Sequence, residues 1–202
     1  GKVTFTIIRL NEDHETTIVI PARPGAGGSK FPFTDVGRND DCYDAVKYLY
    51  ENEIMNGTSD TLFSPNAELT RGMVVTILYR MEGEPFTLGS KSFSDVKAGR
   101  YYSEAVEWAA ENGIVNGFTD GTFKPDQAVT REQLASILRR YASFSGIATY
   151  DAELPANASV SNWAKKDVAW AYAEGILTSA QMVAAAKNAN RAEVAMAIYA
   201  YL

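Results

Sequence analysis

The sequence predicts an all-α protein made of three helix–loop–helix repeats, with pseudo-threefold symmetry around a central three-helix bundle. The first observation is a set of arginines spaced 60 residues apart, each after Thr or Asn: Arg71, Arg131 and Arg191. The second is that other positions also recur after 60 residues, including the pairs Phe33 and Phe93, Asp35 and Asp95, and Phe63 and Phe123. Chance does not produce such a series, so the chain contains an internal repeat. The third is that apolar residues follow each arginine with the 3.6-residue period of a helix.

The N-terminal residues have a different pattern from the rest. Alternating apolar residues over 2–10 and the β-branched run 16–20 predict a short β-hairpin, and the Pro/Gly-rich residues 21–29 predict a linker. We therefore expect residues 1–29 to hold the end of a preceding β domain and the linker. Because the chain opens abruptly in strand-like sequence, we interpret it as a piece of a longer protein with an N-terminal cargo domain. The repeats then occupy residues 30–88, 89–150 and 151–202.

The second helix of each repeat is the most apolar element. In the second repeat Thr130 is a good N-cap, Gln133 completes a capping box, and one helical face is apolar, formed by Leu134, Ile137, Leu138 and Tyr141. One repeat of about 50 residues cannot bury such a face alone, so we expect the three second helices to pack together. The third repeat is degenerate: it lacks the aspartate and the Phe-x-Pro loop, and its alanine-rich residues 179–189 look helical.

Charge and rare residues exclude several classes of function. The net charge of −6 and the pI near 4.9 argue against nucleic acid or an anionic membrane surface as partner. One cysteine excludes an intrachain disulfide and a cysteine-rich zinc site, and one histidine argues against histidine-based catalysis. The sequence contains no apolar run of about 18 residues, the length that could span a membrane. Catalytic motifs and Gly-rich phosphate loops are missing, so we expect no enzyme activity, no cofactor and no metal.

The three arginines are the first candidate binding residues. An arginine at a helix N-terminus combines a bidentate fork with backbone N–H groups, and this combination suits a carboxylate or a phosphate. Three such positions at one period indicate a repeated anionic ligand. The alternative is a structural ion pair within each repeat, Arg71 with Asp35 and Arg131 with Asp95.

The remaining candidates lie in the loops and at the starts of the first helices. Asp35 and Asp95 could orient the arginines or bind sugar hydroxyls, or they could form Asx turns or N-caps of the first helices. Gly57 and Gly117 follow asparagine and predict positive-φ turns that could expose N–H groups to a ligand. The exposed starts of the first helices carry Tyr101 and Trp163, which could stack on sugar rings, whereas the first repeat has Asp41 there.

The sequence resembles S-layer homology domains in its Phe-x-Asp-Val, Asn-Gly, Phe-x-Pro and Thr-Arg motifs, from about Phe31 to Leu202. The second repeat carries the fullest pattern. The resemblance implies non-covalent anchoring of a bacterial surface protein to a secondary cell wall polysaccharide, often through a pyruvylated amino sugar in grooves between repeats. It places the arginine of each Thr-Arg motif at the ketal carboxylate, which points to Arg71, Arg131 and Arg191, with Asp35, Asp95, Gly57 and Gly117 nearby.

The resemblance also implies where the protein works. It predicts an extracellular location at the cell surface or cell wall, with the wall polysaccharide as partner. A protein–protein or self-assembly module at the cell surface is the alternative that the residues leave open.

Overall fold

The computed structural model describes residues 31–202. The expected N-terminal hairpin and the expected linker, residues 1–29, lie outside the described residues. All the regular elements of the described part are helices, joined by loops, which confirms the all-α class. Its elements in chain order are α1 (Tyr43–Glu51), α2 (Arg71–Met81), α3 (Ser103–Glu111), α4 (Arg131–Phe144), the 3-10 helix η1 (Asn162–Ala164), α5 (Lys165–Ala173), α6 (Ser179–Met182) and α7 (Arg191–Tyr201). None of these helices is long and apolar enough to cross a bilayer.

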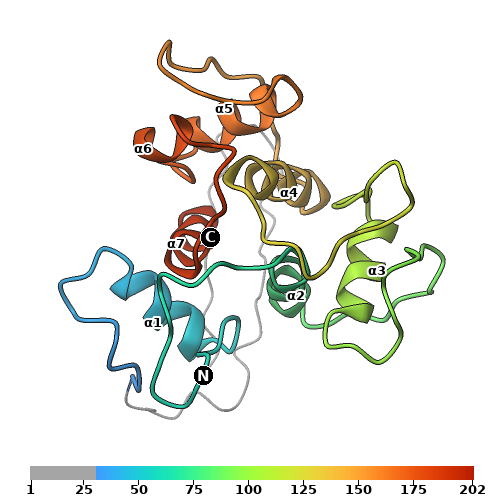
Figure 1. Cartoon of the computed structure of the whole chain (residues 1–202), viewed down its shortest axis with the longest axis horizontal. Helices are drawn as coiled ribbons and strands as arrows, with labels where there is room; N and C mark the ends of the chain where they lie inside the picture. Colours follow the sequence, from blue (N-terminus) through green and yellow to red (C-terminus); the bar gives the residue numbers. More distant parts are fainter. Residues whose placement is uncertain (1–30) are drawn as a thin grey trace, which may run out of the picture. The chain divides into compact units, whose positions relative to one another are not determined.

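The three second helices, α2, α4 and α7, lie at the centre, and the other helices lie around them (Figure 1). A ring of three backbone hydrogen bonds joins the segments that lead into them. Leu69 N donates to Ala189 O at 3.2 Å, Val129 N donates to Leu69 O at 2.9 Å, and Ala189 N donates to Val129 O at 2.8 Å. Leu69, Val129 and Ala189 are fully buried. The cyclic pattern gives the bundle the pseudo-threefold arrangement that the repeat predicts.

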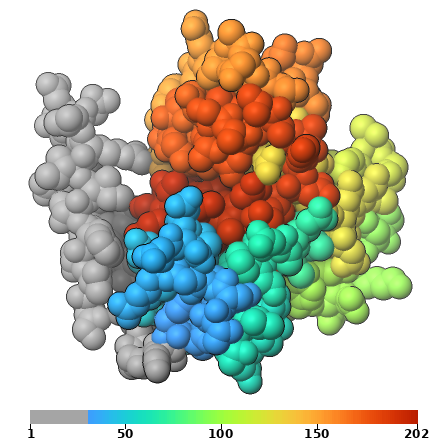
Figure 2. Space-filling view, turned by 60° about the vertical axis from the view of Figure 1, so that its left-hand side comes forward, coloured from blue at the N-terminus to red at the C-terminus, as the bar shows by residue number. Residues whose placement is uncertain are grey.

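Each first helix packs against the second helix of the preceding repeat. Thus α3 packs on α2, α5 packs on α4, and α1 packs on α7 across the two ends of the series. Figure 2 shows the last of these contacts on one face, where the blue first repeat meets the red C-terminal helix. The helices that bury each other's apolar faces therefore come from neighbouring repeats.

The ends of the second helices follow the expected capping chemistry. The Thr130 hydroxyl accepts from Gln133 N, and Gln133 Oε1 accepts from Thr130 N, which confirms the expected capping box. Asn190 and Glu193 form a second capping box at α7. In the third repeat, only the first residues of the alanine-rich segment are α-helical, as α6, and Thr178 caps this single turn.

Candidate functional site

The two aspartates hold the Phe-x-Pro loop of their own repeat. The oxygens of Asp35 accept the backbone N–H groups of Phe63 and Ser64 at 2.8 and 2.7 Å. Asp95 accepts those of Phe123 and Lys124 at the same distances. These bonds are neither an N-cap nor an Asx turn of the first helix, and they do not orient an arginine directly, whereas the binding of sugar hydroxyls by the aspartates stays a prediction.

These carboxylate contacts stabilise a strained backbone. Ser64 and Lys124 have φ values of 60° and 57°, the left-handed region that non-glycine residues rarely adopt. Each aspartate accepts two charge-assisted hydrogen bonds, which offset this local cost. The loop carbonyls of Phe63 and Phe123 are thereby held in fixed positions.

Those carbonyls accept hydrogen bonds from two of the three arginines. Arg71 Nε donates to Phe123 O at 2.9 Å, and Arg191 Nε donates to Phe63 O at 2.7 Å. Each guanidinium also lies over the phenyl ring of the same loop residue, at 4.6 and 4.5 Å from the ring centroid. Each arginine therefore contacts the loop of the next repeat along the ring rather than its own.

The expected ion pairs within one repeat are wrong. The aspartate that acts electrostatically on Arg71 is Asp95, and the one that acts on Arg191 is Asp35. Arg131 pairs with Glu193 instead of Asp95: its Nη2 and Nε lie 2.6 and 3.1 Å from the two carboxylate oxygens. The third repeat lacks the aspartate, and a glutamate on α7 replaces it as the partner.

Contrary to the expectation from the sequence, the backbone N–H groups at the helix starts are not available to a ligand. At α2, Arg71 N donates to Gln127 O at 2.9 Å, Gly72 N donates to Pro125 O at 2.8 Å, and Met73 N donates to the Thr70 hydroxyl at 3.3 Å. The first two N–H groups of α4 and of α7 likewise donate to loop carbonyls of the next repeat. Because the helix starts meet at the centre of the molecule, neighbouring loops satisfy these groups.

Gly57 and Gly117 both lie where a side chain would not fit, but their backbone conformations differ. Gly117 has φ +70°, which confirms a positive-φ turn, whereas Gly57 has no positive φ, so that expectation is wrong for Gly57. Both positions lack room for a side chain. A Cβ at Gly117 would meet the Phe93 ring and lie 2.8 Å from Thr122 O, and a Cβ at Gly57 would meet the Phe33 ring.

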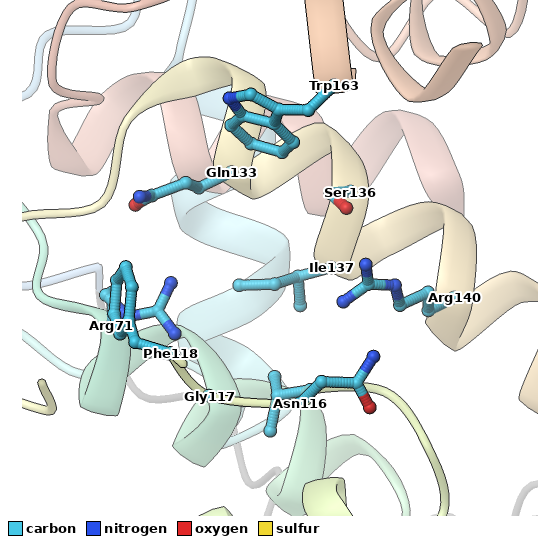
Figure 3. A pocket seen from close by; sticks show the side chains of 10 residues that line it. Arg71, Asn116, Gly117, Phe118, Gln133, Ser136, Ile137, Arg140 and Trp163 are labelled. Carbon is cyan, nitrogen blue, oxygen red and sulfur yellow. The ribbon is translucent and has the colours of Figure 1, made fainter. Parts of the chain in front are cut away.

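A pocket of about 250 Å³ lies where α2, α4 and the start of the third repeat approach one another. Three of the nine sequence-predicted binding residues line it: Arg71, Gly117 and Trp163. Figure 3 shows the guanidinium groups of Arg71 and Arg140 reaching into it from opposite sides, with the Trp163 indole at its edge. The remaining lining residues are Val115, Asn116, Phe118, Gln133, Ser136 and Ile137. None of the ten is acidic.

The pocket is electropositive, and its two arginines influence each other. Burial lowers the pKa of Arg71 to about 10, Asp95 opposes this shift, and the nearby charge of Arg140 adds to it. The guanidinium therefore stays protonated at neutral pH. Arg71 is 7% exposed and is sandwiched between the rings of Phe118 and Phe123, which fix its orientation. Such a fixed, protonated fork is suited to an anion.

Six of the predicted residues do not line this pocket: Arg131, Arg191, Asp35, Asp95, Gly57 and Tyr101. Conversely, the sequence interpretation missed Gln133, Ser136 and Arg140. A signal for them exists, because these polar residues follow the helical period beside the apolar face of α4. Trp163 is 57% exposed and Tyr101 is 55% exposed, so both remain accessible as expected. Within residues 31–202, no three acidic, cysteine or histidine side chains gather as a metal site would require.

The chain is similar in sequence to parts of several larger proteins. It is 38% identical over 110 residues to an endoglucanase of Bacillus sp. strain KSM-635, covering 54% of this chain and 12% of that protein. It is 32% identical over 168 residues to an amylopullulanase of Thermoanaerobacterium thermosulfurigenes, covering 79% of this chain and 9% of the relative. A cellulosome-anchoring protein of Acetivibrio thermocellus is 25% identical over 141 residues, covering 66% of this chain and 30% of the relative. The chain thus spans only about a tenth of the first two relatives.

The family comparison agrees with the motifs of the first two repeats. The matched segments include the aspartates that hold the loops and the arginines that begin α2 and α4. The degenerate third repeat lies outside them. Residues 32–72 and 92–135 of this chain match the S-layer homology domain.

Proposed function

We propose that this chain anchors a bacterial surface protein non-covalently to the cell wall by binding an anionic, pyruvylated secondary wall polysaccharide. The observation that carries the proposal is the pocket lined by Arg71 and Arg140, with no acidic lining residue and with Trp163 exposed at its edge. A carboxylate between two guanidinium groups makes charge-assisted hydrogen bonds, which are stronger than neutral ones.

The acidic balance of the whole chain restricts where an anionic ligand can bind. A net charge of −6 repels polyanions in general, so an anionic polymer would have to enter the pocket to be held. The exposed indole of Trp163 offers a flat apolar face on which a sugar ring can pack. Sugar recognition and charge recognition thus meet at one place.

The relatives support a role in attachment rather than in a shared reaction. Their names describe enzymes with different activities as well as an anchoring protein, and another relative is a surface-layer 125 kDa protein of Lysinibacillus sphaericus. A binding module common to such proteins would place its cargo at the cell surface.

The test is a calorimetric titration of the protein with purified secondary wall polymer, native and with its pyruvate removed. Binding that requires the pyruvate is the expected result, because the arginines would contact its carboxylate. Binding to neither form would refute the proposal and favour the alternative, a protein–protein or self-assembly module.

A pair of aromatic variants sharpens this test. Trp163→Ala should weaken binding, because it removes the exposed ring at the pocket edge. Tyr150→Ala is the matched control: Tyr150 is 49% exposed and does not line the pocket. Equal effects of the two variants would show that the polymer does not use the pocket.

A further inference from the structure

We infer that only one of the three interfaces between repeats binds the acidic sugar, and that Ser136 and Arg140 select it. This inference rests on the proposed function. It concerns the number of sites in the chain and the residues that distinguish one interface from the others.

The three interfaces can be compared because they are built alike. In each, the arginine that begins one second helix donates a hydrogen bond to a loop carbonyl of the next repeat. We name them after that arginine: the Arg71 interface with α4, the Arg131 interface with α7, and the Arg191 interface with α2. The 60-residue period then gives equivalent positions, so that Ser136 corresponds to Thr76 and Met196.

At the Arg131 interface the arginine already holds a carboxylate. Glu193 accepts from its Nη2 and Nε, and Ala184 O accepts from its Nη1 at 3.1 Å. The positions equivalent to Ser136 and Arg140 are Met196 and Ala200, which provide neither a hydroxyl group nor a charge. An incoming anion would have to displace Glu193 and would find no second cation.

At the Arg191 interface the arginine and the hydroxyl equivalent to that of Ser136 are hydrogen-bonded within the protein. Arg191 Nη2 donates to Asn56 O at 2.5 Å, in addition to the bond from its Nε. The Thr76 hydroxyl donates to Gly72 O at 2.8 Å. Arg80 of α2 is equivalent to Arg140 of α4, and its Nε lies 4.0 Å from Glu84 Oε1. This interface has the right residue types but fewer free donors.

The Arg71 interface differs on each of these points. Within residues 31–202, Arg71 makes its side-chain hydrogen bond through Nε alone, and none of the ion pairs in this part of the chain involves Arg140. Ser136 is one of the residues that line the pocket and is only 4% exposed, and its buried hydroxyl has no hydrogen-bond partner in this part of the chain. A buried hydroxyl without a partner is costly, and native structures rarely keep one without reason. A ligand in the pocket would satisfy it.

The arrangement specifies the ligand chemistry. An anionic group would lie between Arg71 and Arg140, and a neighbouring neutral hydroxyl or amide would reach Ser136. A volume of about 250 Å³ is below the range of about 300–1,000 Å³ typical of drug-sized ligands, so it suits a single sugar unit. The ligand is therefore an acidic monosaccharide unit with a polar substituent close to its carboxylate.

The experiment titrates the protein calorimetrically with the methyl glycoside of a pyruvylated amino sugar, with the glycoside lacking pyruvate as the reference ligand. We expect one site per chain. Arg140→Gln should weaken binding by about 10- to 100-fold, since it removes a charged partner, and Ser136→Ala should weaken it by a few fold. The matched control is Arg80→Gln, the same change at the equivalent position of α2, which should alter affinity by less than about twofold.

The possible outcomes separate the inference from the proposed function. Two or three sites, or equal losses in Arg80→Gln and Arg140→Gln, would overturn the single-site inference and leave wall binding intact. Unchanged affinity in Ser136→Ala would overturn its role in selection. Failure of both the glycoside and the native polymer to bind would overturn the inference together with the proposed function. Melting temperatures of all variants exclude misfolding as the cause of a loss.

Discussion

The ion pair between Arg131 and Glu193 leads to a prediction that separates structure from binding. Both side chains are about one-sixth exposed, and Arg131 makes three hydrogen bonds across the interface between the second and third repeats. Arg131→Gln would leave the Glu193 carboxylate part-buried without its cation. Hydrogen bonds to charged groups contribute about 1.5–3 kcal/mol, and breaking a fully buried pair costs about 3–5 kcal/mol. Allowing for partial exposure, we expect a loss of about 2–3 kcal/mol.

For a body of this size, each kcal/mol shifts the melting temperature by about 2–4 °C, so Arg131→Gln should lower it by about 4–12 °C. The assay is thermal unfolding followed by circular dichroism, combined with the glycoside titration. Glu193→Gln and the double variant complete a cycle whose coupling energy reports the pair itself. Arg140→Gln is the reciprocal control, because Arg140 is exposed and should affect binding without affecting stability.

One result would refute this reasoning. If Arg131→Gln weakened glycoside binding while leaving the melting temperature unchanged, Arg131 would be a ligand residue like Arg71. The interfaces would then be equivalent, as the spacing of the three arginines suggests.

Three further predictions concern the loops and the pocket. Asp95→Asn should lower the free energy of unfolding in urea by about 2–3 kcal/mol, because the charged acceptor of two loop N–H groups is lost; no change would mean that the loop holds itself. Gly117→Ala should lower the free energy of unfolding by about 2–4 kcal/mol, because of the positive φ and the contact of the new Cβ with Phe93. Gly113 has the same φ but open space around its Cβ, so Gly113→Ala should lower it by only about 1–2 kcal/mol. Equal losses would show that the contact with Phe93 does not contribute. Ser136→Ala should leave stability unchanged or raise it by up to about 1 kcal/mol, because it removes an unpaired buried hydroxyl; a clear loss would assign Ser136 a structural role instead.

Much of the fold was readable from the sequence because the signals that specify it are local. The capping box at Thr130 and the apolar face that follows it lie within one helix, so the residues involved are close in sequence. The 60-residue period extends this reading to three central helices, since a repeat that cannot bury its own apolar face must pack against its neighbours.

The sequence also indicates some of the residues that line the pocket, but not their partners. Arg71 and Trp163 are two such residues. The repeat makes the partner of Arg71 ambiguous, because its own repeat and the next repeat contain equivalent loops. Only the three-dimensional path of the chain distinguishes Asp35 from Asp95 as the nearby charge.

What the sequence alone determined, then, is the repeat, its helices and the types of side chain at their starts. The tertiary structure decided which repeat supplies each contact: the first helices pack on the preceding repeat, and Arg131 binds Glu193, which lies 62 residues away along the chain. The physical reason is that periodicity and capping depend on neighbouring residues, whereas the environment of each arginine depends on how three similar units meet around one axis. Only the tertiary structure places Ser136 and Arg140 at one pocket, where, among residues 31–202, the Ser136 hydroxyl has no hydrogen-bond partner and Arg140 has no ion pair.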